Sequence, residues 1–147
     1  MSRKHMRWAA VIASLALVAG FSLALRFFST AATDTSADAF FDRTFNDLDG
    51  QPMEMSRWKG RIVVVNFWAT WCPPCVEEMP DLQRVHNEYA DRGVTILGLG
   101  IDSPSALKRF RDEHRLSLPL YAAGSVGSEL GRALGNPSGA LPYTVLV

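Results

Sequence analysis

The chain has 147 residues, of which 15 are basic and 15 acidic, so its formal net charge is zero. Positions 1–33 hold four basic residues and no acidic one, which leaves 11 basic and 15 acidic residues, a net charge of −4, in residues 34–147. That remainder is long enough for one hydrophobic core but not for two, and it carries no basic stripe of the kind that nucleic acid requires.

An apolar segment without any charge runs from Trp8 to Leu25, and three of the four basic residues precede it. A helix of this length spans roughly 27 Å, close to the thickness of the hydrocarbon core of a bilayer. The segment is longer than the apolar region of most cleaved signals. We therefore expect residues 1–28 to be a signal anchor, a transmembrane helix, with cleavage near Thr30-Ala31-Ala32 as the alternative. The charge bias leaves the N-terminus in the cytoplasm and the following chain outside the inner membrane.

Residues 29–38 are small and polar without periodicity, which predicts a tether. One domain is expected over residues 39–147. Near its start, Asp47–Pro52 has the composition of a turn between two short strands, with Gly50 supplying a permissive backbone.

The rest of the domain alternates apolar runs with helical patterns. Strands are predicted over residues 62–68, 94–101, 118–121 and 143–147, and helices over residues 75–92, 104–114 and 125–134. The first helix contains Pro80, which should kink it, and Gly93 ends it. Ser103 and Pro104 form a cap for the second. The alternation indicates an α/β sheet with parallel strands.

The only two cysteines of the chain, Cys72 and Cys75, lie between the strand at 62–68 and the helix that follows, with Pro73 and Pro74 between them. The free N–H groups and the dipole at a helix start favour a thiolate, the attacking species in thiol–disulfide exchange. A structural disulfide would close too short a loop to stabilise much, and a zinc site lacks its other ligands. Two inert buried cysteines are a further alternative. We expect a redox site with neither metal nor cofactor.

The run Val65–Cys75, followed by Glu78-Met79-Pro80, resembles the thioredoxin-like proteins of the TlpA/ResA type, which are membrane-anchored thiol–disulfide reductases outside the bacterial inner membrane. Gly139–Val147 resembles the second signature of that family, in which a cis-proline lies beside the dithiol. The resemblance covers roughly residues 40–147. It implies a thioredoxin-like fold, which is a central mixed sheet with flanking helices, and it implies that this domain faces the periplasm. Because the family has a further strand and helix after this point, we expect the sequence to be truncated at its C-terminus.

The resemblance also implies roles for individual residues. Cys72 is expected to be the nucleophile and Cys75 the more buried resolving thiol of a redox-active disulfide. Glu78 is expected to carry a proton to or from the thiols, although an acid that only favours the first helical turn is the alternative. Trp71 is expected to form part of the docking surface rather than the core. The Leu141–Pro142 bond is expected to be cis and to present the backbone to an extended substrate segment.

Pro73 and Pro74 lack N–H groups, so the Cys72 sulfur receives few hydrogen bonds, which favours a reducing dithiol. Asn66 stands where ordinary thioredoxins have a buried acid, which strengthens the case for Glu78 as proton carrier. The hypothesis is a reductant of disulfides in exported proteins, such as apocytochrome c or copper-site assembly proteins of respiratory oxidases. A membrane electron donor would re-reduce it. A Cu(I)-binding metallochaperone and a thiol peroxidase are the alternatives.

Overall fold

A computed structural model describes residues 34–147, and the expected signal anchor over residues 1–28 lies outside them. None of the helices within residues 34–147 has the length and apolar composition of a membrane span. The strands are β1 (Thr44–Asp47), β2 (Pro52–Glu54), β3 (Ile62–Trp68), β4 (Val94–Gly100), β5 (Leu120–Ala122) and β6 (Tyr143–Leu146). The helices are α2 (Asp34–Phe41), α3 (Pro73–Tyr89), α4 (Pro104–His114) and α5 (Gly124–Ala133), with short 3-10 turns η1 (Met55–Trp58) and η2 (Ala90–Arg92).

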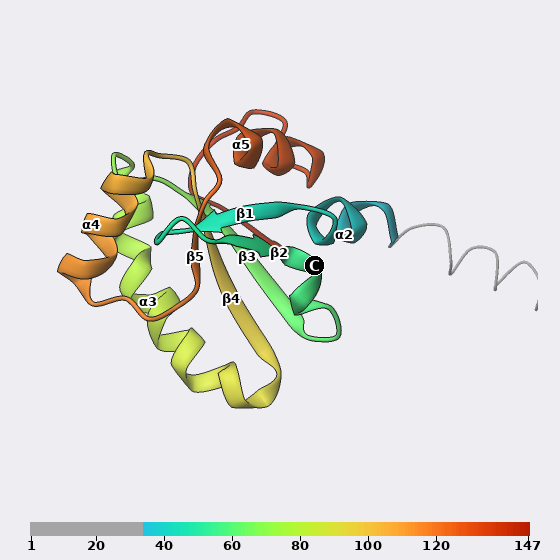
Figure 1. Ribbon diagram of the computed structural model, residues 1–147, viewed down its shortest axis with the longest axis horizontal. Helices are drawn as coiled ribbons and strands as arrows, with labels where there is room; N and C mark the ends of the chain where they lie inside the picture. The colour runs from blue at the N-terminus through green and yellow to red at the C-terminus, as the bar shows by residue number, and fades with distance from the viewer. Residues whose placement is uncertain (1–33) are drawn as a thin grey trace, which may run out of the picture. The chain divides into compact units, whose positions relative to one another are not determined.

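The six strands form one mixed sheet in the order β2-β1-β5-β4-β3-β6 (Figure 1). β3, β4 and β5 are parallel neighbours, whereas β1 runs antiparallel to β5 and β6 antiparallel to β3. The register places Asn66 of β3 between Gly98 of β4 and Thr144 of β6. The mixed sheet that the family resemblance implied is therefore confirmed.

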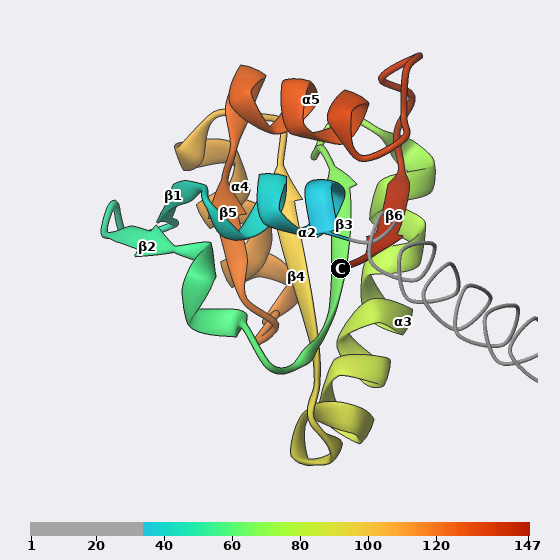
Figure 2. The ribbon, with the colours of Figure 1, turned by 90° about the vertical axis from the view of Figure 1, so that its right-hand side faces the viewer.

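Helices cover both faces of the sheet, with α2 and α5 on one side and α3 and α4 on the other (Figure 2). Each face has its own cluster of buried side chains. The first, called here the apolar face, consists of Phe40, Phe45, Met55, Val63, Val65, Phe67, Leu97, Leu99, Tyr121, Ala123, Leu130 and Leu134. The second, called here the dithiol face, consists of Leu48, Trp68, Ala69, Cys72, Cys75, Met79, Ile96, Leu107, Phe110, Leu118 and Leu120.

Most predicted elements are confirmed within one or two residues at each end. The hairpin turn lies between β1 and β2, and the Ser103 hydroxyl accepts a hydrogen bond from the Ala106 amide at 3.3 Å, as a helix cap does. The helix that begins beside the cysteines runs through Pro80 to Tyr89, and Gly93, with a φ of 82°, follows η2. The left-handed backbone at Gly93 explains why the glycine stands there.

The segment 34–38 differs from its prediction. Its composition indicates an irregular tether, but these residues lie in α2. The helix carries Phe40 into the apolar face, where its side chain is fully buried. Burial of one large aromatic ring outweighs the weak local preference of small polar residues.

Candidate active site

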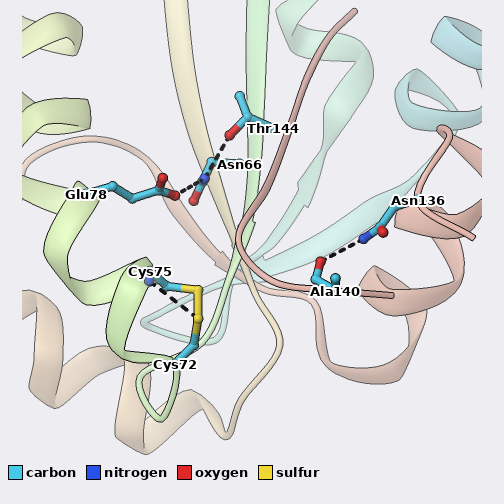
Figure 3. Close-up of a disulfide and its surroundings, with 7 residues drawn as sticks. All are labelled: Asn66, Cys72, Cys75, Glu78, Asn136, Ala140 and Thr144. Carbon is cyan, nitrogen blue, oxygen red and sulfur yellow. Dashed lines mark hydrogen bonds between the residues drawn. A yellow bond between two sulfur atoms is a disulfide. The ribbon is translucent and has the colours of Figure 1, made fainter. Parts of the chain in front are cut away.

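The two cysteines form a disulfide at the start of α3, with their Cα atoms 5.3 Å apart (Figure 3). Cys72 is the N-cap of the helix, and its sulfur accepts a hydrogen bond from the Cys75 amide at 3.4 Å. Cys72 is 6% exposed and Cys75 is fully buried. Cys72 is therefore the cysteine nearer to solvent, and Cys75 is shielded by its own helix.

The prolines determine which backbone groups reach the Cys72 sulfur. Pro73 and Pro74 occupy the first two helical positions and have no N–H to donate. The Val76 amide donates instead to the Cys72 carbonyl oxygen, at 3.1 Å. Among the hydrogen bonds of residues 34–147, the Cys75 amide is the one donor to this sulfur.

Glu78 lies one turn further along α3 and is half-buried. One of its carboxylate oxygens accepts a hydrogen bond from the Nδ2 of Asn66 at 2.7 Å, and the same Nδ2 donates to the Thr144 hydroxyl at 3.0 Å (Figure 3). Asn66 is fully buried. Three elements, α3, β3 and β6, are therefore joined by one amide group.

The residues expected to meet a substrate lie on two loops. Trp71, beside Cys72, has 65% of its surface exposed, so the alternative of plain core packing is wrong. Leu141 is partly buried and packs against both clusters, including the one that contains Cys72 and Cys75. The Leu141–Pro142 peptide bond is cis, as predicted, and Pro142 is half-buried.

Hydrogen bonds fix both loops. In the loop that carries Trp71, the Thr70 hydroxyl donates to the Asp102 carboxylate, and the Cys72 amide donates to the Ala69 carbonyl at 3.2 Å. In the loop before Leu141, the Asn136 side chain donates to the Ala140 carbonyl at 2.9 Å (Figure 3). These contacts hold the exposed Trp71 and the cis-proline loop in place around the disulfide.

The structure brings together some residues that the sequence did not single out as site residues. From the sequence, Asn66 stands out only as a departure from thioredoxins, and Thr144, Asp102 and Asn136 do not stand out. The available signal for Asn66 was one amide inside an otherwise apolar strand, because such a group needs hydrogen-bond partners when buried. The others gave no local signal, since their partners lie on separate elements.

In the described part of the chain, no group of three or more His, Cys, Asp or Glu side chains is placed to hold a metal ion. One hollow, of about 350 Å³, lies beside β1 and the start of β5, and Asp47 and Tyr121 are among its lining residues. Burial raises the pKa of the Tyr121 hydroxyl above its ordinary value. Cys72, Cys75 and Glu78 do not line this hollow, so it is separate from the disulfide.

Comparison with known proteins gives consistent matches. The profile of the AhpC/TSA family matches residues 32–147. The chain is 30% identical over 119 residues to thiol-disulfide oxidoreductase ResA of Geobacillus kaustophilus, which covers 80% of this chain and 68% of that protein. To the ResA of Bacillus thuringiensis subsp. konkukian it is 39% identical over 75 residues, 50% of this chain and 43% of that relative. The chain therefore spans less than half the length of that relative.

A solved structure is similar as well. A thiol:disulfide interchange protein of the thioredoxin family from Chlorobium tepidum TLS aligns with a TM-score of 0.61 and 30% identity. The alignment covers 71% of this chain and 74% of that one.

Proposed function

The chain belongs to the AhpC/TSA family, among the thioredoxin-like thiol–disulfide oxidoreductases of the ResA type, and on this basis we propose that it reduces disulfides in proteins outside the inner membrane. One observation carries the proposal: Cys72 and Cys75 are bonded at the first turn of α3, beside an exposed Trp71 and a cis Leu141–Pro142 bond. A thiol at a helix start is the arrangement that thiol–disulfide exchange uses.

The first step forms a mixed disulfide. In the reduced protein, the Cys72 thiolate attacks one sulfur of a substrate disulfide. A bond forms between Cys72 and that sulfur, the substrate S–S bond breaks, and the second substrate sulfur leaves as a thiolate that takes up a proton. Trp71 provides apolar contact area beside the attacking sulfur.

The second step releases the substrate. Cys75 loses its proton and attacks the Cys72 sulfur, so the Cys72–Cys75 disulfide forms and the remaining substrate sulfur departs as a thiolate. Overall, two electrons pass from the dithiol to the substrate disulfide, and the protons that Cys72 and Cys75 lose are balanced by those that the two substrate thiolates take up. Glu78, one turn behind Cys75, is the group that we assign to take the Cys75 proton. A membrane dithiol donor then returns the two electrons and two protons.

Pro73 and Pro74 support the reducing direction. A helix start with ordinary residues offers several amides to the sulfur, and each one stabilises the thiolate and hence the reduced form. Here the Cys75 amide alone donates to it within the described residues. A less stabilised thiolate gives a stronger electron donor.

The substrates that we propose are apocytochrome c, whose two haem-binding thiols must be reduced before haem is attached, and copper-site assembly proteins of respiratory oxidases. We propose that the apolar segment Trp8–Leu25 anchors the chain in the inner membrane with the domain in the periplasm. Retention of the full chain in alkali-washed membranes tests the anchor. Release into the wash would contradict it and favour a cleaved signal.

The activity is tested with the reduced full chain and an oxidised peptide of the Cys-x-x-Cys-His type. We expect peptide thiols to appear as the chain's thiols disappear, and Cys72→Ser to abolish the reaction. The variant Cys75→Ser should stop at a stable mixed disulfide that mass spectrometry detects. Equal rates for the wild type and Cys72→Ser would overturn the proposal. Fast peroxide consumption without peptide reduction would indicate a thiol peroxidase instead, and tight Cu(I) binding without exchange a metallochaperone.

A further inference from the structure

We propose that Asn66 is a positioning residue that accepts a hydrogen bond from the Cys75 thiol in the reduced protein while it holds the Glu78 carboxylate in place. This inference rests on the thiol–disulfide chemistry of the proposed function, and it assigns a second task to the amide that joins β3 to α3.

The position of Asn66 in β3 directs its side chain to the face of the sheet that contains the cysteines. Neighbouring residues of a strand point to opposite faces of the sheet. Val65 and Phe67 belong to the apolar face, whereas Val64 and Trp68 pack in the dithiol face. Asn66 lies between Val64 and Trp68 in this alternation and therefore shares the face that contains Cys75. Figure 3 shows its amide oxygen on the side of the group that faces the disulfide.

The two ends of this amide differ in their partners. The nitrogen donates both of its hydrogens, to Glu78 at 2.7 Å and to Thr144 at 3.0 Å. The oxygen is buried and has no hydrogen-bond partner among the described residues. Nδ2 of Asn66 donates to the Glu78 side chain, so the atom that faces Glu78 is the nitrogen, and the unpartnered atom is the oxygen.

A buried acceptor without a donor is unfavourable, and residues 34–147 of the oxidised protein offer no donor to this oxygen. The disulfide sulfurs carry no hydrogen. When a dithiol reductant supplies two electrons and two protons, the S–S bond breaks and Cys75 gains an S–H group. That S–H is a new donor on the same face of the sheet as the Asn66 oxygen.

The hydrogen bond therefore exists in one redox state and not in the other, and it favours the reduced form. A neutral amide suits this task better than a carboxylate. It accepts the S–H without taking its proton and without repelling a thiolate. Glu78 is the group proposed to take the proton, and the nitrogen of the same Asn66 amide donates a hydrogen bond to it.

The test measures the dithiol–disulfide equilibrium of the full chain against glutathione. Asn66→Leu, which keeps the approximate volume, should shift the equilibrium about three- to tenfold toward the disulfide, the range of one lost hydrogen bond. Thr144→Val is the matched control, because it removes a partner of the nitrogen and leaves the oxygen untouched. It should change the equilibrium by less than about twofold. Equal shifts in the two variants, or none in Asn66→Leu, would overturn the inference.

A second measurement does not depend on the folding of Asn66→Leu. In the Cys72→Ser chain, Cys75 carries the only thiol, and its S–H stretching band can be read by infrared spectroscopy. A hydrogen bond lowers the S–H stretching frequency. We therefore expect the Cys75 band at a lower frequency than that of a thiol dissolved in an apolar solvent, where it has no hydrogen-bond acceptor. A band at the free-thiol position would contradict the inference. Both experiments measure a property of the two cysteines and need no protein substrate. The role of Asn66 can therefore be confirmed or contradicted independently of the proposed reduction of exported proteins.

Discussion

The two faces of the sheet are built from alternate residues of the same strand and differ in what they contain. On the apolar face, Val63, Val65 and Phe67 of β3 lie among other fully apolar side chains, apart from the Tyr121 hydroxyl. On the dithiol face, β3 contributes Asn66, and the cluster includes two cysteines. One face is organised for packing alone, whereas the other accommodates a chemical group that changes its bonding. Substitutions on the apolar face should therefore alter stability, and those near Asn66 should alter the redox site.

Replacement of Phe67 by Ala should have the largest effect on stability. The ring is fully buried and lies 5.9 Å from the Tyr143 ring, centroid to centroid. We expect a loss of about 3–5 kcal/mol in the free energy of unfolding, as for other buried aromatic residues. Urea titration of the full chain measures it, with Leu146→Ala, at a side chain 66% exposed, as control. Similar losses for both variants would contradict the assignment of Phe67 to the core.

Replacement of Glu78 by Gln should affect the chemistry with little effect on stability, since the glutamine oxygen can still accept from Asn66. Without a group to take the proton of Cys75, the release of substrate from the mixed disulfide should slow about 100-fold. Rapid-quench trapping of the mixed disulfide measures this step. Glu77→Gln, one position earlier and exposed, is the matched control. A slow step in both variants would point to the helix start rather than to a proton carrier.

Two glycines distinguish the packing of the two faces. A Cβ at Gly100 would lie 2.4 Å and 2.5 Å from the methyl carbons of Leu107, which is fully buried on the dithiol face, so Gly100→Ala should cost about 1–3 kcal/mol. A Cβ at Gly131 of α5 would meet Phe67 at 3.6 Å, an ordinary contact, so Gly131→Ala should stabilise by about 0.5–1 kcal/mol. The thermal unfolding midpoints of the two variants measure these changes in stability. Shifts in the same direction would contradict this difference in packing between Gly100 and Gly131.

The smallest expected effect is a pH dependence from His86 on α3. Burial, and then the charge of Arg61, lower the pKa of His86 below its ordinary value of 6.5. The unfolded chain therefore binds a proton more readily than the folded one, so the contribution of His86 to stability is present above about pH 6.5 and is lost as the pH falls below it. His86→Gln should flatten the unfolding free energy between about pH 5 and 7. An unchanged slope would show that other groups dominate.

Features set by neighbouring residues could be predicted from the sequence. The apolar run at 62–68 is β3, and the cap formed by Ser103 begins α4. The redox site could be predicted from the spacing of the two cysteines and from their position between a strand and a helix. The bond from Asn66 to Thr144 could not be predicted, because the two residues are 78 positions apart and meet only through the register of β3 with β6. The same holds for Thr70 and Asp102, which lie on different loops. The helix over 34–41 depends on the burial of Phe40, which local composition does not reveal.

The hydrogen bond from the Cys75 amide to the Cys72 sulfur has one further consequence. Since Pro73 and Pro74 carry no amide hydrogen, Cys75 is the first residue of α3 that an amide-detected NMR spectrum can observe. Its N–H points at the reactive sulfur, so its chemical shift reports the charge on that atom without any added probe. The first amide signal of the helix therefore follows the redox and protonation state of Cys72, and it belongs to the residue that we propose as the resolving cysteine.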